Sequence, residues 1–311
     1  MSFTDTALQM VVLAIPILIG YIAHKLGFMG GDFDSKLSGL VVNVTLPAMI
    51  IASVCSQELP AASDIAQLLA FSFVGYVIAT ALALIVPVLM GSDKALRGAY
   101  SFIVAFGNVG LIGFPVLSAV LGSEAVLYAA IANIPWNIFV FSVGMILISG
   151  VPEGGFGEVV KSCAKKLLSP VLIASVIVLV LVLLGINDLG ILGDGLTTCG
   201  KFTTPAALLI SGSSLANYSP REMVNNWRAY VAVAARLILV PCALLLVMRP
   251  FVSSQFVLGI IVLGQAMPVA TNGILYCLMY GVDAKPMTQG TFISIVASIL
   301  TIPLIAMLVM A

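Results

Sequence analysis

Two polar interruptions of long apolar runs hold the residues whose chemistry is easiest to assign. The first, "GNVGLIGFP", covers residues 107–115, and the second, "QAMPVATNG", covers residues 265–273. Each carries an asparagine, Asn108 or Asn272, beside helix-breaking glycine or proline. A carboxamide donates two hydrogen bonds without the solvation cost of a buried charge, and a helix N-terminus offers free N–H groups and partial positive charge. The two interruptions therefore predict a binding site for an anion.

Two roles remain open for each asparagine. Either its amide contacts the substrate, or it satisfies the backbone groups that its own helix break leaves unpaired. We expect substrate contact, because the two residues lie at corresponding breaks. Five neighbours in the interruptions complete the predicted binding site, namely Gly110, Gly113, Pro115, Pro268 and Thr271.

Lys201 is an anomaly, because it lies inside an apolar run. A lysine near the middle of a membrane span costs about 2.5–3.5 kcal/mol on insertion scales, so such residues usually face a cavity. We count it among the substrate-binding residues, together with Asn43 and Asn137. It either supplies a counter-charge for a carboxylate or replaces a sodium ion with a titrating amine. A third reading is that its span begins later and that it snorkels to the outer interface.

Other polar residues in the apolar runs have simpler expected roles. For Arg236, about a third of the way through its run, we expect a structural or snorkelling role. Asn133 and Asn137 lie one helical turn apart and share a face, where hydrogen bonds between helices are expected. His24 is expected at the surface. All thirteen acidic residues fall in loops or at the ends of runs, which disfavours a mechanism that needs a buried carboxylate.

The composition places these residues in a membrane. Of 311 residues, 61% are hydrophobic and 8% are charged, whereas a soluble domain carries about 25% charged residues. Apolar runs of about 20 residues favour an all-α bundle over a β-barrel. The net charge of zero gives no reason to expect nucleic acid as a partner. The five cysteines are scattered, so we predict no metal site and no cofactor.

Charged and glycine-rich breaks divide the sequence into ten candidate membrane spans. They lie near residues 7–24, 37–56, 65–90, 97–121, 125–149, 167–186, 195–216, 228–248, 254–280 and 287–310. With this count, ten of the thirteen basic residues fall in loops on one side and only Arg249 on the other. The basic side is normally cytoplasmic. We therefore predict a multi-pass protein of the cytoplasmic membrane with both termini outside.

The sequence divides into two halves of five spans. We predict a first repeat at residues 1–150, a cytoplasmic linker at 151–166 and a second, inverted repeat at 167–311. "NVTLPAMIIAS" (43–53) matches "KFTTPAALLIS" (201–211) at an offset of 158. The same offset superposes the two polar interruptions. Gly/Pro-interrupted segments at corresponding places in inverted halves are typical of secondary transporters.

The sequence resembles the auxin efflux carrier family, which contains the plant PIN auxin exporters and bacterial malate and malonate permeases. The resemblance is carried by "NVTLPA" (43–48), "NVGLIGFPVL" (108–117), "AMPVATNGILYCLMYGVD" (266–283) and "FISIVASILTIPLI" (292–305). It implies ten helices in two inverted five-helix repeats, with the fourth and ninth helices broken and crossing near their prolines. The fourth span lacks the prolines that flank asparagine in the plant members, and the central loop is short. Both differences favour the bacterial permeases.

These features predict a secondary active transporter and no enzymatic activity. The expected substrate is a small organic anion, a mono- or dicarboxylate such as malonate or malate, bound where the fourth and ninth spans cross and moved by alternating access. Uniport or proton-linked movement is preferred to sodium coupling, since no buried acid is present. The alternative is a sodium-dependent symporter of the bile-acid type. The lipid bilayer is a predicted partner, and the resemblance also allows a homodimer.

Overall fold

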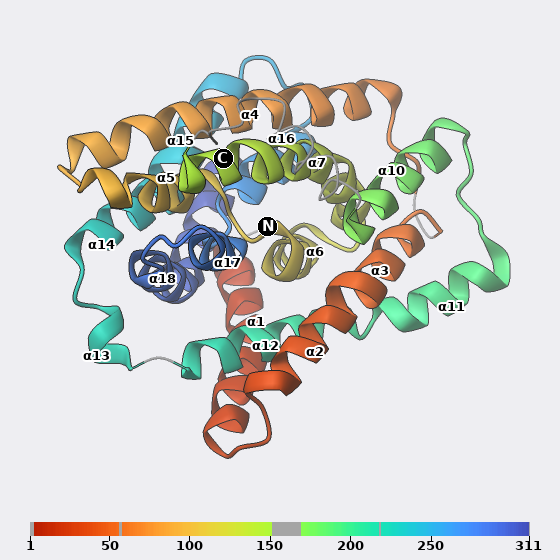
Figure 1. The fold of residues 1–311 in the computed structure, drawn as a ribbon. Helices are drawn as coiled ribbons and strands as arrows, with labels where there is room; N and C mark the ends of the chain where they lie inside the picture. The colour runs from red at the N-terminus through yellow and green to blue at the C-terminus, as the bar shows by residue number, and fades with distance from the viewer. Residues whose placement is uncertain (1–2, 56–57, 151–168, 218, 311) are drawn as a thin grey trace.

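A computed structural model describes residues 3–55, 58–150, 169–217 and 219–310 of the chain. Within these ranges the protein is built from helices, and strand pairing is confined to one isolated bridge (Figure 1). The all-α class predicted from the sequence is therefore confirmed for the described residues. The linker predicted at 151–166 lies outside them.

Five continuous helical segments are long and apolar enough to cross a membrane. They are Gly31–Ala52, Ala62–Leu89, Ala125–Ser149, Trp227–Met248 and Lys285–Met310. Four shorter apolar helices cover Val11–Lys25, Val109–Leu121, Pro170–Leu183 and Gln255–Gln265. All nine fall within or beside the predicted spans. The architecture is thus that of an integral membrane protein, while the count of ten spans remains a prediction.

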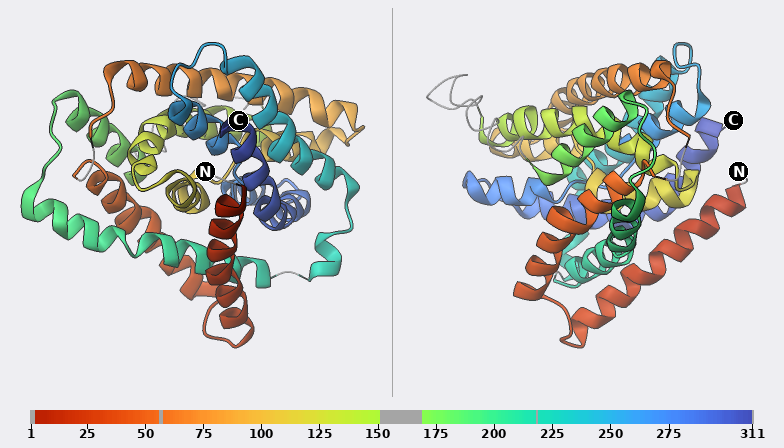
Figure 2. Two further views of the ribbon diagram at one scale, coloured as in Figure 1. Left: turned by 180° about the vertical axis from the view of Figure 1, so that it is seen from behind. Right: turned by 90° about the vertical axis from the view of Figure 1, so that its right-hand side faces the viewer.

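One group of helices forms a panel along one side of the molecule. It consists of α1 (Phe3–Lys25), α2 (Gly31–Leu40), α3 (Leu46–Ala52), α10 (Pro170–Leu183), α11 (Gly190–Gly200) and α12 (Thr203–Ala216), with a π-helical turn, η1 (Val41–Thr45), between α2 and α3. Within this panel α1 packs on α12, and α3 packs on α10 and α11. The turn between α1 and α2 forms the tip at the bottom of Figures 1 and 2.

The other group forms the core of the molecule. Its first members are α4 (Ala62–Leu89), η2 (Lys94–Leu96), α5 (Arg97–Ala105), η3 (Val109–Gly113), α6 (Phe114–Leu121), α7 (Ala125–Phe139), η4 (Val140–Gly144) and α8 (Met145–Ser149). Its later members are α13 (Pro220–Met223), α14 (Trp227–Ala234), η5 (Ala235–Leu239), α15 (Val240–Met248), α16 (Gln255–Gln265), α17 (Asn272–Met279) and α18 (Lys285–Met310). The two groups meet where α10 packs on α7 and where α1 packs on α18 and α6.

Two glycines set the tight packing inside the panel. A Cβ atom on Gly20 of α1 would lie 2.1 Å from the carbonyl oxygen of Leu209, and one on Gly212 of α12 would lie 1.8 Å from that of Ile17. Each helix therefore needs glycine where the other crosses it. Small residues allow such close approach in membranes, where packing rather than hydrophobicity holds helices together. The pair makes α1 and α12 a closely fitted unit.

The two matching segments found in the sequence lie against each other in the panel. Thr203 Oγ1 donates a hydrogen bond to Thr45 Oγ1 at 3.0 Å, and the two residues are 158 positions apart. That separation equals the offset at which the sequences match.

Candidate substrate-binding site at two helix breaks

Two core helices are interrupted near their middles, at the places predicted from the sequence. The first ends with α5 at Ala105 and resumes with η3 at Val109, and Phe106 between them is extended (φ −121°, ψ 116°). The second ends with α16 at Gln265 and resumes with α17 at Asn272. Glycine and proline disfavour helix at these points. Both breaks are buried, so their backbone polar groups need partners.

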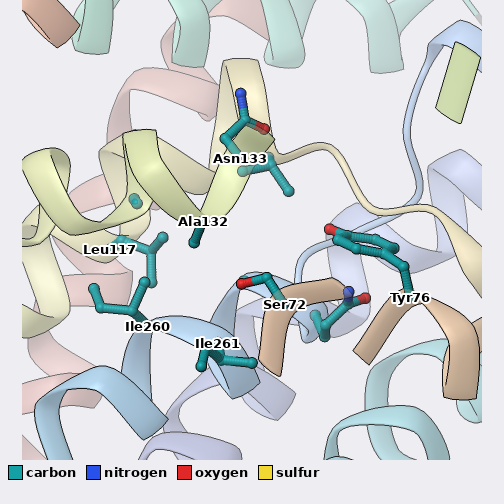
Figure 3. Close-up of a pocket in the computed structure, with 11 residues that line it drawn as sticks. Ser72, Tyr76, Leu117, Ala132, Asn133, Ile260 and Ile261 are labelled. Atoms are coloured by element: carbon teal, nitrogen blue, oxygen red, sulfur yellow. The ribbon is translucent and has the colours of Figure 1, made fainter. Parts of the chain in front are cut away.

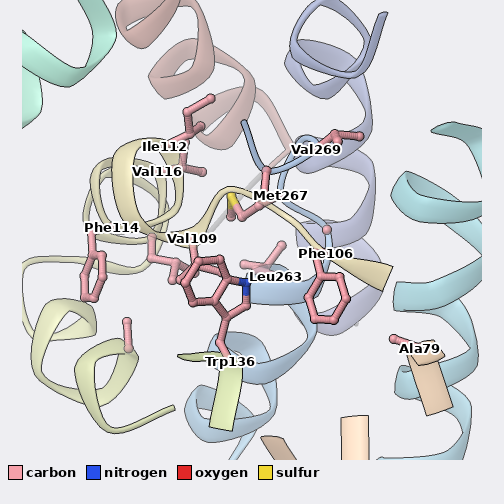
Figure 4. Close-up of a cluster of buried hydrophobic side chains, with 14 of the residues drawn as sticks. Ala79, Phe106, Val109, Ile112, Phe114, Val116, Trp136, Leu263, Met267 and Val269 are labelled. Atoms are coloured by element: carbon pink, nitrogen blue, oxygen red, sulfur yellow. The ribbon is translucent and has the colours of Figure 1, made fainter. Parts of the chain in front are cut away.

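The two breaks satisfy each other through their backbones. Asn108 N donates to Pro268 O at 2.6 Å, and Ala270 N donates to Phe106 O at 3.0 Å. These bonds flank an antiparallel bridge between Gly107 and Val269. Figure 4 shows the two extended segments passing each other in a cluster of buried apolar side chains. Unpaired backbone groups cost several kcal/mol in a membrane interior, so each break stabilises the other.

Arg236 seals the C-terminal ends of the interrupted helices. Its guanidinium donates to Ala105 O at 2.8 Å and Val104 O at 3.5 Å, to Met267 O at 3.2 Å, and to Gln265 Oε1 at 3.0 Å. The side chain is fully buried. The last carbonyls of a helix carry partial negative charge, which a cation complements. The expected snorkelling of Arg236 is therefore wrong, and its structural role is to hold both breaks.

Gly107 lies next to the Arg236 guanidinium and to Met267 O of the second break. A Cβ atom there would lie 2.2 Å from Arg236 Nη2 and 2.9 Å from Met267 O. On the other side, Trp136 Nε1 donates to Gly107 O at 3.1 Å, and the Trp136 ring lies beside the first extended segment in Figure 4. Only glycine lets the guanidinium approach the backbone so closely.

The N-terminal ends of the resumed helices have a different environment, because they border cavities. Asn108 caps η3, its Oδ1 accepting a hydrogen bond from Leu111 N at 3.0 Å. Asn108 is 7% exposed. Asn108, Leu111 and Thr271 line both a cavity of about 280 Å³ and one of about 100 Å³. The capping role considered from the sequence is thus present, and Asn108 also borders open space.

The larger cavity, called here the hydroxyl cavity, extends between the breaks and the panel. Seven of its lining residues carry hydroxyl groups, namely Ser35, Ser38, Ser211, Ser214, Thr271, Thr288 and Thr291. One lining residue is acidic, Asp34, which accepts hydrogen bonds from Gly30 N at 2.9 Å and from Ser213 Oγ. The other lining residues are apolar or carry amides.

The smaller cavity, called here the amide cavity, is lined by four carboxamides. They are Asn108, Asn133, Asn137 and Asn272, and Trp136, Ser169 and Thr271 lie beside them. Neither acidic nor basic side chains are among its described lining residues. The cavity therefore offers several neutral donors close to the N-terminal ends of η3 and α17.

Asn133 is the member of this set with the strongest unmet hydrogen-bonding capacity. It is 1% exposed, and neither its Oδ1 nor its Nδ2 has a hydrogen-bond partner among the described residues. It borders the amide cavity and also a smaller cavity of about 20 Å³. Figure 3 shows its carboxamide pointing away from Ser72 and Tyr76, which line that smaller cavity. A buried polar group without a partner usually marks a place for water or ligand.

Asn137 and Asn133 were both expected to bond between helices, and they differ. Asn137 Oδ1 accepts a long hydrogen bond of 3.4 Å from Ser169 Oγ, which joins α7 to the start of α10, and its Nδ2 donates to Asn133 O at 2.9 Å. For Asn133 the structure gives no such bond, so that expectation fails. The shared face of the two residues is confirmed, since both line the amide cavity.

Two predicted site residues lie away from the breaks. Asn43 is exposed and donates to Gly39 O at 2.8 Å within its own helix. Lys201 is exposed where α11 gives way to α12 and lines a separate cavity of about 210 Å³ with Met49 and Ser118. The structure therefore does not bring Asn43 and Lys201 together with Asn108.

The remaining predicted residues divide into lining and framework positions. Gly110 and Thr271 border the amide cavity. Pro268 contributes the carbonyl that Asn108 N bonds, and Gly113 N donates to Asn108 O at 2.9 Å. Pro115 is buried in the first turn of α6. The prolines and Gly113 thus shape the breaks without lining either cavity.

His24, expected at the surface, is partly exposed and also contacts a buried hydroxyl group. Its Nδ1 lies 2.8 Å from the Oγ of Ser213, which is fully buried and donates to Asp34. This chain of bonds joins α1, α12 and α2 beside the hydroxyl cavity. Its signal in the sequence was only the single histidine at the end of an apolar run.

Comparison with known proteins gives one consistent result. A family model described as "Membrane transport protein" matches residues 6–306. An uncharacterized transporter of Methanothermobacter thermautotrophicus is 24% identical over 98% of this chain and 97% of its own length. The uncharacterized transporter YfdV of Escherichia coli is 28% identical over 63% of each chain. The uncharacterized transporter MJ1031 of Methanocaldococcus jannaschii is 21% identical over 94% of this chain and 95% of its own.

Proposed function

This chain belongs to the membrane transport protein family, that of the auxin efflux carriers, and we propose that it is a carrier for a small organic anion. The substrate is a mono- or dicarboxylate such as malonate or malate. It binds where the two interrupted helices meet, with Asn108, Asn272 and Thr271 beside it. The carrier works in the cytoplasmic membrane by alternating access.

One observation carries this proposal. Asn108 and Thr271, the N-cap residues of the helices that resume after the two breaks, line both cavities. A ligand at this point touches a capping amide and two helix N-terminal ends at once. Neutral donors and helix N-termini stabilise a carboxylate. The carboxamide N–H groups that line the amide cavity can donate hydrogen bonds to such an anion.

The proposed inverted repeat is supported by one contact in the panel and by a pair of bonds at the breaks. Thr45 and Thr203 bond each other at the offset of the sequence match. At the breaks, an offset of 162 makes Phe106 correspond to Pro268 and Asn108 to Ala270. With this correspondence, the bond from Asn108 N to Pro268 O is equivalent to the bond from Ala270 N to Phe106 O. The two offsets differ by about one helical turn. We infer that the halves are related by an axis through both contacts, with a four-residue insertion between them.

Alternating access follows from the division into panel and core. In the proposed mechanism the core carries the breaks and moves against the panel, whose α1 and α12 are tightly fitted at Gly20 and Gly212. The hydroxyl cavity lies toward the loops assigned to the cytoplasm, since Asp34 and Asn217 border it. The described conformation is then open to the inside, with the termini outside.

Arg236 bears on the coupling ion. Carbonyl and amide oxygens at the ends of two helices could coordinate a sodium ion. In this structure the guanidinium of Arg236 binds them instead. A permanent cation at this point favours uniport or proton-linked movement. The alternative, a sodium-dependent symporter of the bile-acid type, requires its ion site elsewhere.

Uptake into proteoliposomes tests the proposed function. Labelled malonate, malate and pyruvate are offered in sodium-free and sodium-containing buffers, with empty liposomes as the control. We expect saturable uptake of at least one carboxylate that does not depend on sodium. Sodium-dependent uptake would select the symporter, and the absence of uptake for every carboxylate would refute the proposed substrate class.

A further inference from the structure

We propose that an anionic phospholipid binds at the end of α4, with its phosphate on Arg97 and Arg228 and one acyl chain in an apolar groove beside them. The inference goes beyond the proposed function and does not depend on which substrate is carried. It rests on two guanidiniums without an acidic partner in the described chain and on a large cavity that begins next to them.

Two arginines from different helices meet at the turn that follows α4. Arg228 of α14 donates from Nη2 to Gly91 O at 3.0 Å, and Arg97 of α5 donates from Nε to Ser92 O at 3.2 Å. Gly91 and Ser92 are consecutive residues, so the two guanidiniums bind neighbouring carbonyl groups. An arginine has five N–H donors. Each of these bonds uses one, and the other donors can bind a phosphate.

Neither guanidinium has a carboxylate partner among the residues that the structure describes. The ion pair found there joins Lys36 to Asp32 at the exposed surface. The Nε atom of Arg228 is buried and has no hydrogen-bond partner in this part of the chain, whereas a buried donor normally has one. Lys94 adds a third cation to the turn and Asp93 adds one acid, which gives a net charge of +2. The turn therefore attracts an anion.

An apolar groove of about 700 Å³ begins beside the arginines and follows α14, η5 and α15. Trp227 and Met90, which precede Arg228 and Gly91 in the sequence, line one end, and Cys242 lines the other. From Trp227 to Cys242 the helix rises about 22 Å, at about 1.5 Å per residue. One leaflet is half of a hydrocarbon core of about 30 Å. The groove is thus long enough for an acyl chain.

The chemistry of the two parts selects an anionic phospholipid as the occupant. Two arginines suit a phosphate, and the groove has no charged side chain in its described lining. Both arginines lie at loops predicted to be cytoplasmic, where the leaflet is anionic and basic pockets bind lipid head groups. The Trp227 ring lies 5.2 Å from Cζ of Arg228 and is 58% exposed, as is typical of tryptophan at a membrane interface.

The groove also borders the segment that holds the two broken helices. Ala235, Ile238 and Leu239 of η5 line it, and Arg236 in the same turn donates to carbonyl groups of both breaks. In Figure 1, α15 continues from this segment and lies beside α4, on which it packs. An acyl chain in the groove therefore supports the turn from which Arg236 reaches the breaks, and bound lipid should stabilise the protein.

The test measures lipid binding to the full-length protein by native mass spectrometry. Phosphatidylglycerol and phosphatidylcholine with identical acyl chains are compared, and glycerol phosphate provides a head group without chains. We expect phosphatidylglycerol to bind about tenfold more tightly than phosphatidylcholine, because choline places a cation beside the arginines. Equal binding of the two lipids would overturn the proposal. Glycerol phosphate that binds as tightly as phosphatidylglycerol would identify a site for free phosphate and would overturn it as well.

Three single variants separate the head-group end from the groove. Arg97→Gln and Arg228→Gln should each weaken phosphatidylglycerol binding about fivefold and reduce its preference over phosphatidylcholine. The matched control is Arg221→Gln, which removes the same charge from an exposed arginine on α13. Ala234→Phe fills the groove and should weaken both lipids equally. An unchanged preference in both arginine variants, or the same loss in the control, would contradict the proposal.

Tryptophan fluorescence gives a readout on the unaltered protein, so it decides the matter even if an arginine variant does not fold. Phosphatidylglycerol with brominated acyl chains is added as a minor component to phosphatidylcholine vesicles that contain the protein. We expect quenching of Trp227, which lines the groove, and Trp227→Phe identifies its share against Trp136. Brominated phosphatidylcholine at the same fraction should quench less. Equal quenching by the two lipids would show that Trp227 contacts bulk lipid only and would overturn the proposal.

Discussion

At the two breaks, the helix C-termini and the helix N-termini have different surroundings. The C-terminal ends of α5 and α16 are closed by one buried guanidinium, which holds Val104, Ala105 and Met267 through their carbonyls. The N-terminal ends of η3 and α17 are capped at most by Asn108 and border cavities. Arg236 thus occupies the C-terminal side, and we place the substrate at the N-terminal ends of η3 and α17.

The difference has an energetic basis. Carbonyl groups at a helix C-terminus attract cations, and an arginine can bond several of them from one position. N–H groups at an N-terminus attract anions. A permanent acidic side chain there would block a transported anion, whereas small neutral amides leave the position free. We therefore expect substitutions beside the C-terminal ends of α5 and α16 to lower stability. Substitutions beside the N-terminal ends of η3 and α17 should instead reduce transport.

Arg236→Gln should have the largest effect. The variant leaves buried carbonyls from two helices without a donor, and disrupting a buried charged network typically costs about 3–5 kcal/mol. We expect a large loss in thermal stability and no transport. Arg236→Lys should recover part of the stability, because it restores a cation. Equal stability of Arg236→Gln and the unaltered protein in detergent would contradict the sealing role.

Gly107→Ala should have the next largest effect. Its Cβ would meet Arg236 Nη2 at 2.2 Å, so the guanidinium or the extended segment must shift. Overpacking of this kind typically costs about 1–3 kcal/mol. The matched control is Gly264→Ala on α16, where an added Cβ meets nothing within 4 Å. Thermal unfolding measures both variants. An equal loss of stability in Gly107→Ala and Gly264→Ala would contradict the close approach of Arg236 to Gly107.

Asn108→Ala and Asn272→Ala should separate function from folding. Loss of the Asn108 cap should cost about 1 kcal/mol, well below the effect of Arg236→Gln, while carboxylate uptake should be abolished in both variants. Asn43→Ala is the control, since Asn43 is exposed and bonds only within its own helix in the described structure. Near-normal uptake by both cavity variants would remove these asparagines from the site.

Lys201→Met should have the smallest effect of the series. The residue is exposed and lines a cavity that contains none of the residues at the breaks. Surface substitutions usually change stability by about 0.5 kcal/mol or less, and we expect uptake within about twofold of the unaltered protein. A much larger loss for dicarboxylates than for pyruvate would instead assign Lys201 to the transport path.

The sequence predicted the positions of both breaks because their cause is local. Glycine, proline and asparagine in an apolar run disfavour helix wherever the chain goes, so residues 107–115 and 265–273 stood out. The family and the all-α class followed from composition and motifs. Asn108, Thr271 and Asn272 stood out in the sequence because they lie at the breaks, and their contact with substrate stays a prediction.

The partners across the breaks depend on packing, which the sequence does not encode at short range. The match at an offset of 158 held for Thr45 and Thr203, but the breaks pair Gly107 with Val269, 162 positions apart. Arg236 was visible as a charge in an apolar run, yet the direction of its side chain depends on three other segments. Lys201 is exposed in the structure, which fits the interfacial alternative, so its apolar sequence context did not imply burial.

Counterflow in sodium-free buffer tests the central claim most directly. Proteoliposomes are loaded with unlabelled carboxylate and diluted into labelled carboxylate at low concentration, once with the unaltered protein and once with Asn108→Ala. A carrier that exposes one site alternately should accumulate label transiently above its equilibrium level, and the variant should not. Label that only equilibrates with the unaltered protein, or identical accumulation by both proteins, would contradict a carrier site at the meeting point of the two broken helices.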